Sequence, residues 1–199
     1  MIRGDTNHGN EAIVSNNFET MKNIGRRVAE KYLMTQARAN KHPRKITSFN
    51  QIKTIGILYD ATLEERIAEV KHISKKLNAM GKEIYTLGFI DKKILPPNLE
   101  PNTKEDYYCR KDLHWYKLPI KERISRFANE PFDYLLNVFT ADELPLVGLS
   151  ALSKASCRLG TFHKKYTGCY DFMLNEEGTK TASELLDAYI LYLYKLKND

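Results

Sequence analysis

The sequence has few cysteines, no long apolar run and no secretion signal. Its three cysteines, Cys109, Cys157 and Cys169, are too few and too far apart for a zinc knuckle or a disulfide framework. Such sparse use of cysteine is typical of a reducing compartment. No apolar run approaches the roughly 20 residues that a membrane-spanning helix needs, and the N-terminus lacks the apolar core of a signal peptide. We therefore expect a soluble, cytoplasmic protein.

The sequence also lacks the motifs of common enzyme classes. The turn around Asp60, after the first predicted strand, contains neither a Gly-x-Gly-x-x-Gly nor a Walker pattern. There is no Gly-x-Ser-x-Gly nucleophile elbow and no metal-ligand spacing. His163 could act as a base, but a histidine in a basic surface loop more often has no catalytic role. We predict no catalytic residue, no cofactor and no metal. Whether the chain is an enzyme stays open, with a non-catalytic role favoured.

Positive charge is concentrated near the N-terminus. Between Met21 and Lys45, eight lysines and arginines stand against one acid, Glu30, whereas the whole chain has a net charge of +6. This segment accounts for all of the net positive charge, which indicates an anionic partner such as nucleic acid or a membrane surface. The predicted anion- or RNA-binding residues are Lys22, Arg26, Arg27, Lys31, Arg38, Arg44 and Lys45.

A basic amphipathic helix is predicted over Met21–Ala39. Apolar residues recur there every three or four positions, while most of the basic residues lie off that stripe. The apolar stripe consists of Met21, Ile24, Val28, Tyr32 and Leu33. The helix could dock this stripe on the main domain and leave a solvated basic face, or it could bind phosphates or a membrane surface. Residues 1–20 are expected to be disordered, 21–50 to form the helix and a linker, and 51–199 to form an α/β domain.

Two β-α-β units define the predicted fold. In Phe132–Phe162 an apolar strand, a polar loop, an amphipathic helix and a second apolar strand follow one another, and Lys53–Ile90 has the same order. The helix within Lys53–Ile90 is expected to start with a capping box of Thr62 and Glu65 and to end at Gly81. Because helical crossovers join parallel neighbours, we predict a doubly wound, mostly parallel five-stranded sheet of the Rossmann or flavodoxin type, extended by the basic helix.

Aromatic and basic side chains are interleaved between Tyr107 and Lys117. The stretch contains four aromatic and three basic residues. Such interleaving suits a platform for single-stranded RNA, on which bases stack on rings while cations hold phosphates. The alternative is a short strand or turn that covers the sheet edge with its rings buried. This alternative is favoured, because no RNP-type signature accompanies the aromatic residues.

A ligand crevice is expected beyond the carboxyl ends of the strands, where the strand order reverses. If the strand that ends at Asp60 neighbours the strand Tyr134–Phe139, the crevice involves Asp60, Thr62, Thr140 and Asp142. Asp60 and Asp142 could form a carboxylate pair for acid–base chemistry. Alternatively, Asp142 caps the helix that follows it.

Two resemblances add to these patterns. The strand that begins Phe132-Asp133, the stretch Ser150–Ala155 and the tripeptide Arg158-Leu159-Gly160 resemble the N-terminal half of heptosyltransferase-type glycosyltransferases. This implies a single-domain or degenerate sugar- or nucleotide-binding protein. Nearly the whole chain also resembles a family of small uncharacterised Bacteroidota proteins, a domain of unknown function, which implies the extent of the domain and no activity. That second resemblance is carried by Lys53–Asp60, Leu87–Lys93, Arg110–Trp115, Phe132–Asn137, Leu144–Leu146, Ser150–Gly160 and Cys169–Asp171.

Three functions are consistent with these observations. The first is a non-catalytic binding module whose basic helix holds RNA or a ribonucleoprotein. The second is a glycosyltransferase-like or nucleotide-binding protein, against which the missing motifs count. The third is a peripheral membrane adaptor on an anionic surface. Tyr32 is the only aromatic residue on the apolar stripe and tryptophan is absent from it, which favours RNA or a protein partner over a membrane.

Overall fold

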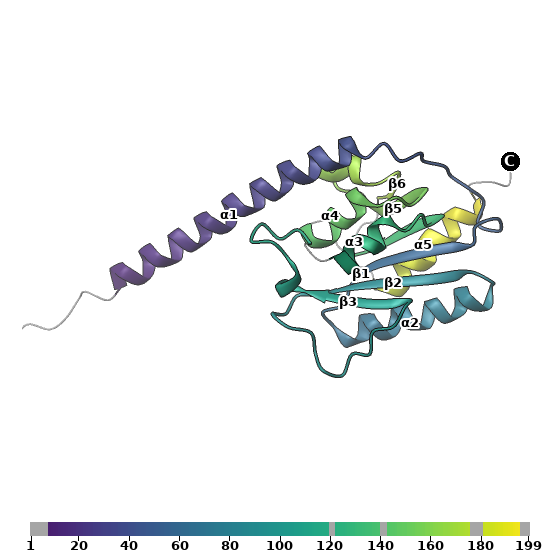
Figure 1. The fold of residues 1–199 in the computed structure, drawn as a ribbon, viewed down its shortest axis with the longest axis horizontal. Coiled ribbons are helices and arrows are strands. Elements are labelled where there is room, and N and C mark those ends of the chain that lie inside the picture. The colour runs from purple at the N-terminus through teal and green to yellow at the C-terminus, as the bar shows by residue number, and fades with distance from the viewer. Residues whose placement is uncertain (1–7, 120–121, 140–142, 176–180, 196–199) are drawn as a thin grey trace, which may run out of the picture.

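The protein is built on a sheet of six parallel strands in the order β3-β2-β1-β4-β5-β6 (Figure 1). The structure, a computed structural model, describes residues 8–119, 122–139, 143–175 and 181–195, without the side chains of residues 8–19, 21, 22 and 123. The strands are β1 (Thr54–Asp60), β2 (Glu83–Ile90), β3 (Glu105–Cys109), β4 (Tyr134–Val138), β5 (Cys157–Thr161) and β6 (Phe172–Leu174). The α/β class and the Rossmann-like arrangement are confirmed. The predicted five, mostly parallel strands are corrected to six, all parallel in the described chain.

The additional strand is β3, at one edge of the sheet. Tyr107 and Tyr108 pair there with Gly88 and Phe89 of β2, and both tyrosine rings are buried. The aromatic and basic stretch is therefore divided. Its first part is an edge strand with buried rings, as the favoured alternative predicts, and its second part is a short 3-10 turn, η1 (Arg110–Asp112), and a loop.

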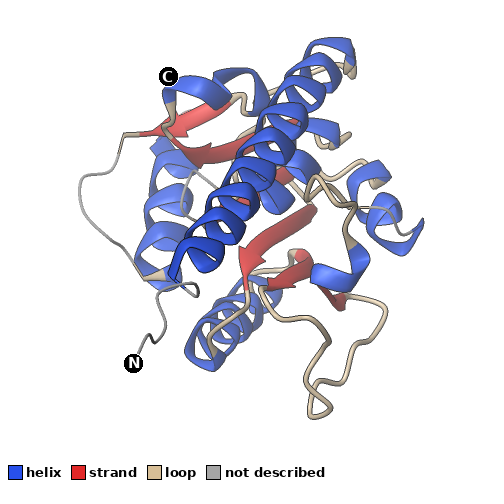
Figure 2. Ribbon diagram, turned by 90° about the vertical axis from the view of Figure 1, so that its left-hand side faces the viewer, coloured by secondary structure: helices blue, strands red, loops and turns tan. Residues whose placement is uncertain are grey.

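Helices cover both faces of the sheet (Figures 1 and 2). One face carries α2 (Glu64–Ala79) and α5 (Ala182–Lys195). The other carries α1 (His8–Ala39), α3 (Glu122–Asn129), α4 (Leu144–Leu152) and the 3-10 segment η2 (Lys164–Cys169). Successive side chains of a strand point to opposite faces. Accordingly, Ile57 and Tyr59 of β1 join the core under α2 and α5, while Leu58 joins the core under α1 and α4.

The two ends of α2 differ in how well the sequence predicts them. Gly81 has a φ of 76°, the left-handed conformation that ends a helix and that glycine adopts without strain. The predicted capping box of Thr62 and Glu65 is wrong, because Leu63 is the N-cap and makes no side-chain cap hydrogen bond. The Thr62 hydroxyl instead accepts a hydrogen bond from the backbone N–H of Asp91, at the end of β2.

Helix α1 begins at His8, ahead of the predicted start at Met21, so residues 8–20 are helical where a disordered lead-in is expected from the sequence. Its N-terminal part extends beyond the α/β body (Figure 1). Its C-terminal part packs against α4 and η2. Docking on the main domain is thus observed for this part of the helix.

The side of α1 that docks shares only Leu33 with the described side chains of the predicted apolar stripe. Gly25, Ala29, Leu33 and Ala37, spaced by four residues, form the buried face. Ile24, Val28 and Tyr32 belong to the predicted stripe but are 51%, 42% and 45% exposed. The buried row consists mainly of small residues, which let α1 approach the domain closely. Small residues contribute little apolar signal to a sequence pattern, so the larger exposed residues dominate the prediction.

Candidate functional site

The strand order reverses between β1 and β4, where the sequence predicts a ligand crevice. β1 and β4 are hydrogen-bonded neighbours, with Tyr59 opposite Val138. The condition for the predicted crevice is therefore met. Asp60 and Thr62 line a cavity at this edge, whereas Thr140 and Asp142 lie outside the described residues, so their part in the crevice stays a prediction.

A chain of polar contacts connects the ends of the first three strands. The Asp60 carboxylate accepts a hydrogen bond from the backbone N–H of Thr62 (2.9 Å) and lies 3.7 Å from the guanidinium of Arg66. Thr62 in turn accepts from the backbone N–H of Asp91 (3.0 Å). The Asp91 carboxylate receives two hydrogen bonds from Arg110, at 2.5 and 2.7 Å. Such a bidentate pair fixes the geometry of both side chains.

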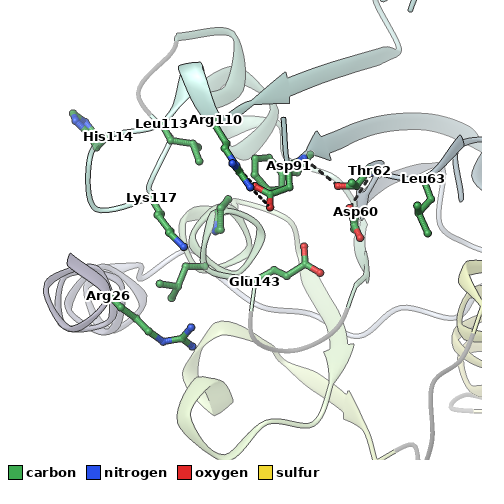
Figure 3. Close-up of a pocket in the computed structure, with 13 residues that line it drawn as sticks. Arg26, Asp60, Thr62, Leu63, Asp91, Arg110, Leu113, His114, Lys117 and Glu143 are labelled. Carbon is green, nitrogen blue, oxygen red and sulfur yellow. Dashed lines mark hydrogen bonds and ion pairs between the residues drawn. The ribbon is translucent and has the colours of Figure 1, made fainter. Parts of the chain in front are cut away.

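The cavity has a volume of about 930 Å³ and reaches from α1 to the β1–α2 turn (Figure 3). Cavities of some 300–1,000 Å³ accommodate small-molecule ligands. The charged residues that line it are Arg26, Asp60, Asp91, Arg110, Lys117 and Glu143. Three acids and three bases thus face one space.

The Asp91–Arg110 pair of the cavity is stabilised in its ionised form. The hydrogen-bonded guanidinium of Arg110 lowers the pKa of Asp91 against the opposing effect of burial, with Lys117 adding to the decrease. The same pair raises the pKa of Arg110. Burial raises the pKa of Tyr108 well above its ordinary value, and Glu143 adds to this. Tyr108 therefore stays protonated, and its hydroxyl donates to the carbonyl of Pro145 (3.1 Å).

Lys117 has an unusual backbone conformation. Its φ of 64° lies in the left-handed region, and it is the one non-glycine residue of the described chain with a positive φ. Lys117 ends a tight turn in which its backbone N–H donates to the carbonyl of His114. Glycine or asparagine would adopt this conformation with less strain. The lysine side chain points into the cavity (Figure 3).

The seven predicted anion-binding residues fall into distinct environments. Arg27, Lys31, Arg38 and Lys45 are exposed. Arg26 forms an ion pair with Glu30, one turn along α1, and lines the cavity. The side chain of Lys22 lies outside the described part of the chain.

Arg44 has a structural role. Its guanidinium donates to the carbonyls of Ser153 (3.2 Å) and Ala155 (2.5 Å), just beyond the last turn of α4. Arg158, which is only 4% exposed, also donates to the end of α4 and forms a double hydrogen bond with Asp171. Helix C-termini carry unsatisfied carbonyl groups and a partial negative charge, which these arginines neutralise.

A cluster of aromatic side chains lies against α1. Trp115 is 71% exposed and lies over Gly25, and the ring of Tyr116 is 6.2 Å from that of Tyr32. His114 stacks on Tyr116 at 4.8 Å. The loop that carries these rings follows η1, so it belongs to the stretch that the sequence offers as an RNA platform.

Other candidates from the sequence have local roles or no site. His163 stacks on Tyr166, and its Nδ1 accepts from the backbone N–H of Lys165, which holds the start of η2. No group of three or more His, Cys, Asp or Glu side chains suited to a metal ion occurs among the described residues. No helix of the described ranges is long and apolar enough to cross a membrane.

Sequence reasoning misses several residues of the cavity. Arg110 and Lys117 follow β3, and they cannot be placed beside Asp60 unless β3 is recognised as a strand. The signal that could reveal it is Asp106-Tyr107-Tyr108-Cys109, a short run with β-forming tyrosines before a polar turn. Arg26 comes from α1, whose orientation on the sheet no local pattern specifies.

Comparison with known families gives one match. Residues 26–196 match a model described as a family of unknown function (DUF6913). The chain belongs to this family. The region shared with DUF6913 starts within α1 and runs beyond the last described residue of α5. It includes Ala29, Leu33 and Ala37 of the docked face and all the residues that line the cavity. No curated protein and no solved structure matches the chain.

Proposed function

We propose that this member of DUF6913 is a non-catalytic binding module that holds single-stranded RNA on the exposed face of α1. The observation that carries the proposal is that the surface around α1 carries both exposed cations and exposed aromatic rings. Nonspecific single-strand binding needs both, because rings stack on bases while cations neutralise phosphates. We call this surface the α1 face and define it by Arg27, Lys31, Arg38, Tyr32 and Trp115.

The cations of the α1 face are available to a ligand. Arg27, Lys31 and Arg38 are exposed, and within the described residues none of them forms an ion pair. Lys45 is exposed at the far end of the same basic segment. A cation without an internal partner can meet a phosphate without first breaking another contact. Arg44 is excluded from the proposal because its guanidinium is committed to the end of α4.

The aromatic rings of the α1 face support stacking. Trp115 is the most exposed large apolar side chain of the described residues, at 71%. Its ring meets that of Tyr116 edge to face, with the centroids 5.4 Å apart. The ring of Tyr116 in turn lies 6.2 Å from that of Tyr32 on the helix. Stacking of one base on an aromatic side chain contributes about 1–3 kcal/mol. Tyr107 and Tyr108 take no part, because both are buried in β3.

The test is a measurement of RNA affinity over a range of salt concentrations by filter binding. Each phosphate neutralised on a single strand contributes about 0.7 to the slope of log K against log salt. The triple variant Arg27→Gln/Lys31→Gln/Arg38→Gln should therefore reduce the slope by about 2. Trp115→Ala should weaken binding and leave the slope unchanged.

The matched control is Lys75→Gln/Lys76→Gln/Lys93→Gln, which removes the same charge from exposed residues outside the α1 face. An equal loss of slope in this control would show that RNA responds to net charge only. Absence of RNA binding by the unmodified protein at low salt would reject the proposal.

A second candidate function is attachment to an anionic membrane surface. The observation in its favour is that Ile24, Val28 and Tyr32, spaced by four residues on α1, are exposed, and that Trp115 covers Gly25 of the same helix. Aliphatic and tryptophan side chains flanked by cations are typical of helices that lie in the lipid interface. The loop supplies the tryptophan that the helix lacks. The absence of tryptophan from the helix therefore does not disfavour a membrane surface in the folded protein.

The double variant Ile24→Ser/Val28→Ser distinguishes the two candidates. It should abolish co-sedimentation with anionic vesicles, because interfacial binding scales with buried apolar area. Binding to RNA should change little, since the cations and rings remain. Strong vesicle binding without RNA binding would establish the membrane candidate in place of the first.

A further inference from the structure

The cavity at the strand ends carries opposite charges on its two sides (Figure 3). None of the residues that line it belongs to the α1 face. Lys117 and Arg26 reach into it from the loop after β3 and from α1. Asp60 lies on the opposite side, and Glu143 points into the space from the start of α4. The cavity thus has a cationic side and an anionic side.

The pair in the middle of the cavity contributes little net charge. Asp91 and Arg110 are joined by two short hydrogen bonds and compensate each other. Asp60 keeps one carboxylate oxygen on the backbone N–H of Thr62, with Arg66 3.7 Å from the other. These contacts fix the position of the acids before a ligand arrives, and such preorganisation reduces the entropy lost on binding.

Lys117 provides the strongest indication of a ligand. Its ammonium makes no ion pair within the described residues, and its backbone holds a left-handed conformation that disfavours lysine. Strained residues of this kind cluster at ligand-binding sites. A lysine that is strained, unpaired and directed into a cavity of about 930 Å³ is suited to receive an anionic group.

The opposite side is unsuited to a second anion. The N-terminus of a helix commonly binds phosphate, but the first turn of α2 carries Glu64 and Glu65, and Asp60 precedes it. After the larger effect of burial, the negative charges of Glu143 and Asp60 both raise the pKa of Tyr108. A dinucleotide, whose pyrophosphate would meet these carboxylates, is therefore disfavoured. A ligand amine would be attracted to them.

We propose that the cavity binds a small dipolar molecule, with its carboxylate or phosphate against Lys117 and Arg26 and its amine against Asp60 and Glu143. The class includes free α-amino acids and short peptides, in which the anion is a carboxylate, and aminoalkyl phosphates. This site is independent of RNA binding at Arg27, Lys31 and Arg38, so either proposal can fail alone.

The test is titration calorimetry of the full chain with three sets of probes. The first set comprises the twenty α-amino acids and glycylglycine, and phosphoethanolamine represents the phosphate-bearing source. The second set is the same amino acids with an acetylated amine, and the third has an amidated carboxylate. At least one dipolar probe should bind, and its acetylated and amidated forms should each bind about tenfold more weakly or worse, because each loses a charge-assisted hydrogen bond.

Two variants assign each end of the probe to its side of the cavity. Lys117→Gln should weaken a dipolar probe about tenfold and leave its amidated form unchanged. Asp60→Asn should weaken the dipolar probe and leave its acetylated form unchanged. Lys111→Gln, an exposed lysine outside the cavity, is the matched control and should have no effect. Lys117→Asn replaces Lys117→Gln if the glutamine variant does not fold, since asparagine tolerates a positive φ.

Absence of binding by every dipolar probe at millimolar concentration would overturn the proposal. So would equal affinity for the dipolar, acetylated and amidated forms. Binding that Lys117→Gln leaves unchanged would place the ligand elsewhere and reject the site. If phosphoethanolamine binds and the amino acids do not, the dipolar class stands with phosphate as the anionic group.

Discussion

The arginines on the α1 face and those at the end of α4 carry the same charge but differ in burial and in ion pairing. Arg27 and Arg38 are exposed and form no ion pair in the described chain. Arg158 is 4% exposed, and both its contacts with Asp171 are 2.9 Å. Arg44, only six residues after Arg38, lies 3.7 Å from the same carboxylate.

This difference shows that a run of positive charge in a sequence does not identify a binding surface. Arg44 and Arg158 donate hydrogen bonds to carbonyls at the C-terminal end of α4 and so contribute to folding. Exposed arginines contribute little to folding and remain available to a partner. Variants at the two places should separate stability from binding.

The largest loss of stability is expected for Arg158→Leu. The change leaves Asp171 without its bidentate partner and removes a donor to the carbonyl of Ser150. Breaking a buried pair by removing one partner costs about 3–5 kcal/mol. Urea unfolding followed by circular dichroism measures the effect. The double variant Arg158→Leu/Asp171→Leu should recover part of the loss, and a cost below about 1 kcal/mol for the single variant would contradict the structural role.

Arg44→Leu should destabilise less, by about 1–3 kcal/mol. Its side chain is 22% exposed. Its buried Nη2 has no hydrogen-bond partner among the described residues, so the native contacts are less complete than those of Arg158. The same unfolding experiment applies. A loss of RNA affinity at unchanged stability would instead assign Arg44 to the binding surface.

Alkaline pH should destabilise the protein through the buried thiols. Burial raises the pKa of Cys157 and of Cys169 to about 12, and Asp171 adds to the effect at Cys157. Unfolded thiols titrate near pH 8.5, so the stabilisation is complete below that pH and is lost as pH rises toward 12. The loss is about 1.4 kcal/mol per pH unit for each thiol.

Unfolding free energies measured between neutral pH and pH 10 check this prediction. The variant Cys157→Ala/Cys169→Ala should show a shallower pH dependence than the unmodified chain. An identical dependence in both proteins would mean that other groups, such as the buried tyrosines, cause the alkaline loss.

Lys117→Asn should stabilise the protein by roughly 0.5–1 kcal/mol, because asparagine tolerates the left-handed backbone at this position. The control is Lys111→Asn in η1, which has no such conformation to relieve. A stabilised Lys117→Asn protein that no longer binds dipolar probes would show that the strain is kept for the ligand. Destabilisation would indicate that the lysine side chain supports the fold.

The smallest change in stability is expected for Arg27→Gln/Lys31→Gln/Arg38→Gln. Exposed substitutions away from caps and buried contacts usually stay within about 0.5 kcal/mol. The same protein should show the largest decrease in the salt dependence of RNA binding. A stability loss comparable to that of Arg44→Leu would remove the contrast between the two sets of cations.

Periodicity predicts the regular part of this fold well. β1 and β4 are short apolar runs that are buried on both faces, and α2 buries Val70, Ile73 and Leu77 on one side. The position of the cavity follows from the strand order, which two β-α-β units make predictable. The sequence could therefore place Asp60 and Thr62 at the edge of the sheet where the cavity lies.

Other features depend on contacts that no local pattern contains. β3 lies at a sheet edge and begins with Glu105 and Asp106, so its polarity resembles that of a loop. The buried row of α1 is made largely of small residues and gives a weak signal. The hydrogen bonds of Arg44 depend on the end of α4, more than a hundred residues away in the sequence.

The position of Trp115 provides a means of observing the α1 face. Trp115 is the only tryptophan of the chain, and it rests on Gly25 with 71% of its surface exposed. Its indole emission therefore originates at the proposed contact surface and nowhere else. A stacked base would quench the emission and a lipid interface would shift it to the blue. Unmodified protein and a fluorimeter thus suffice to distinguish the two partners.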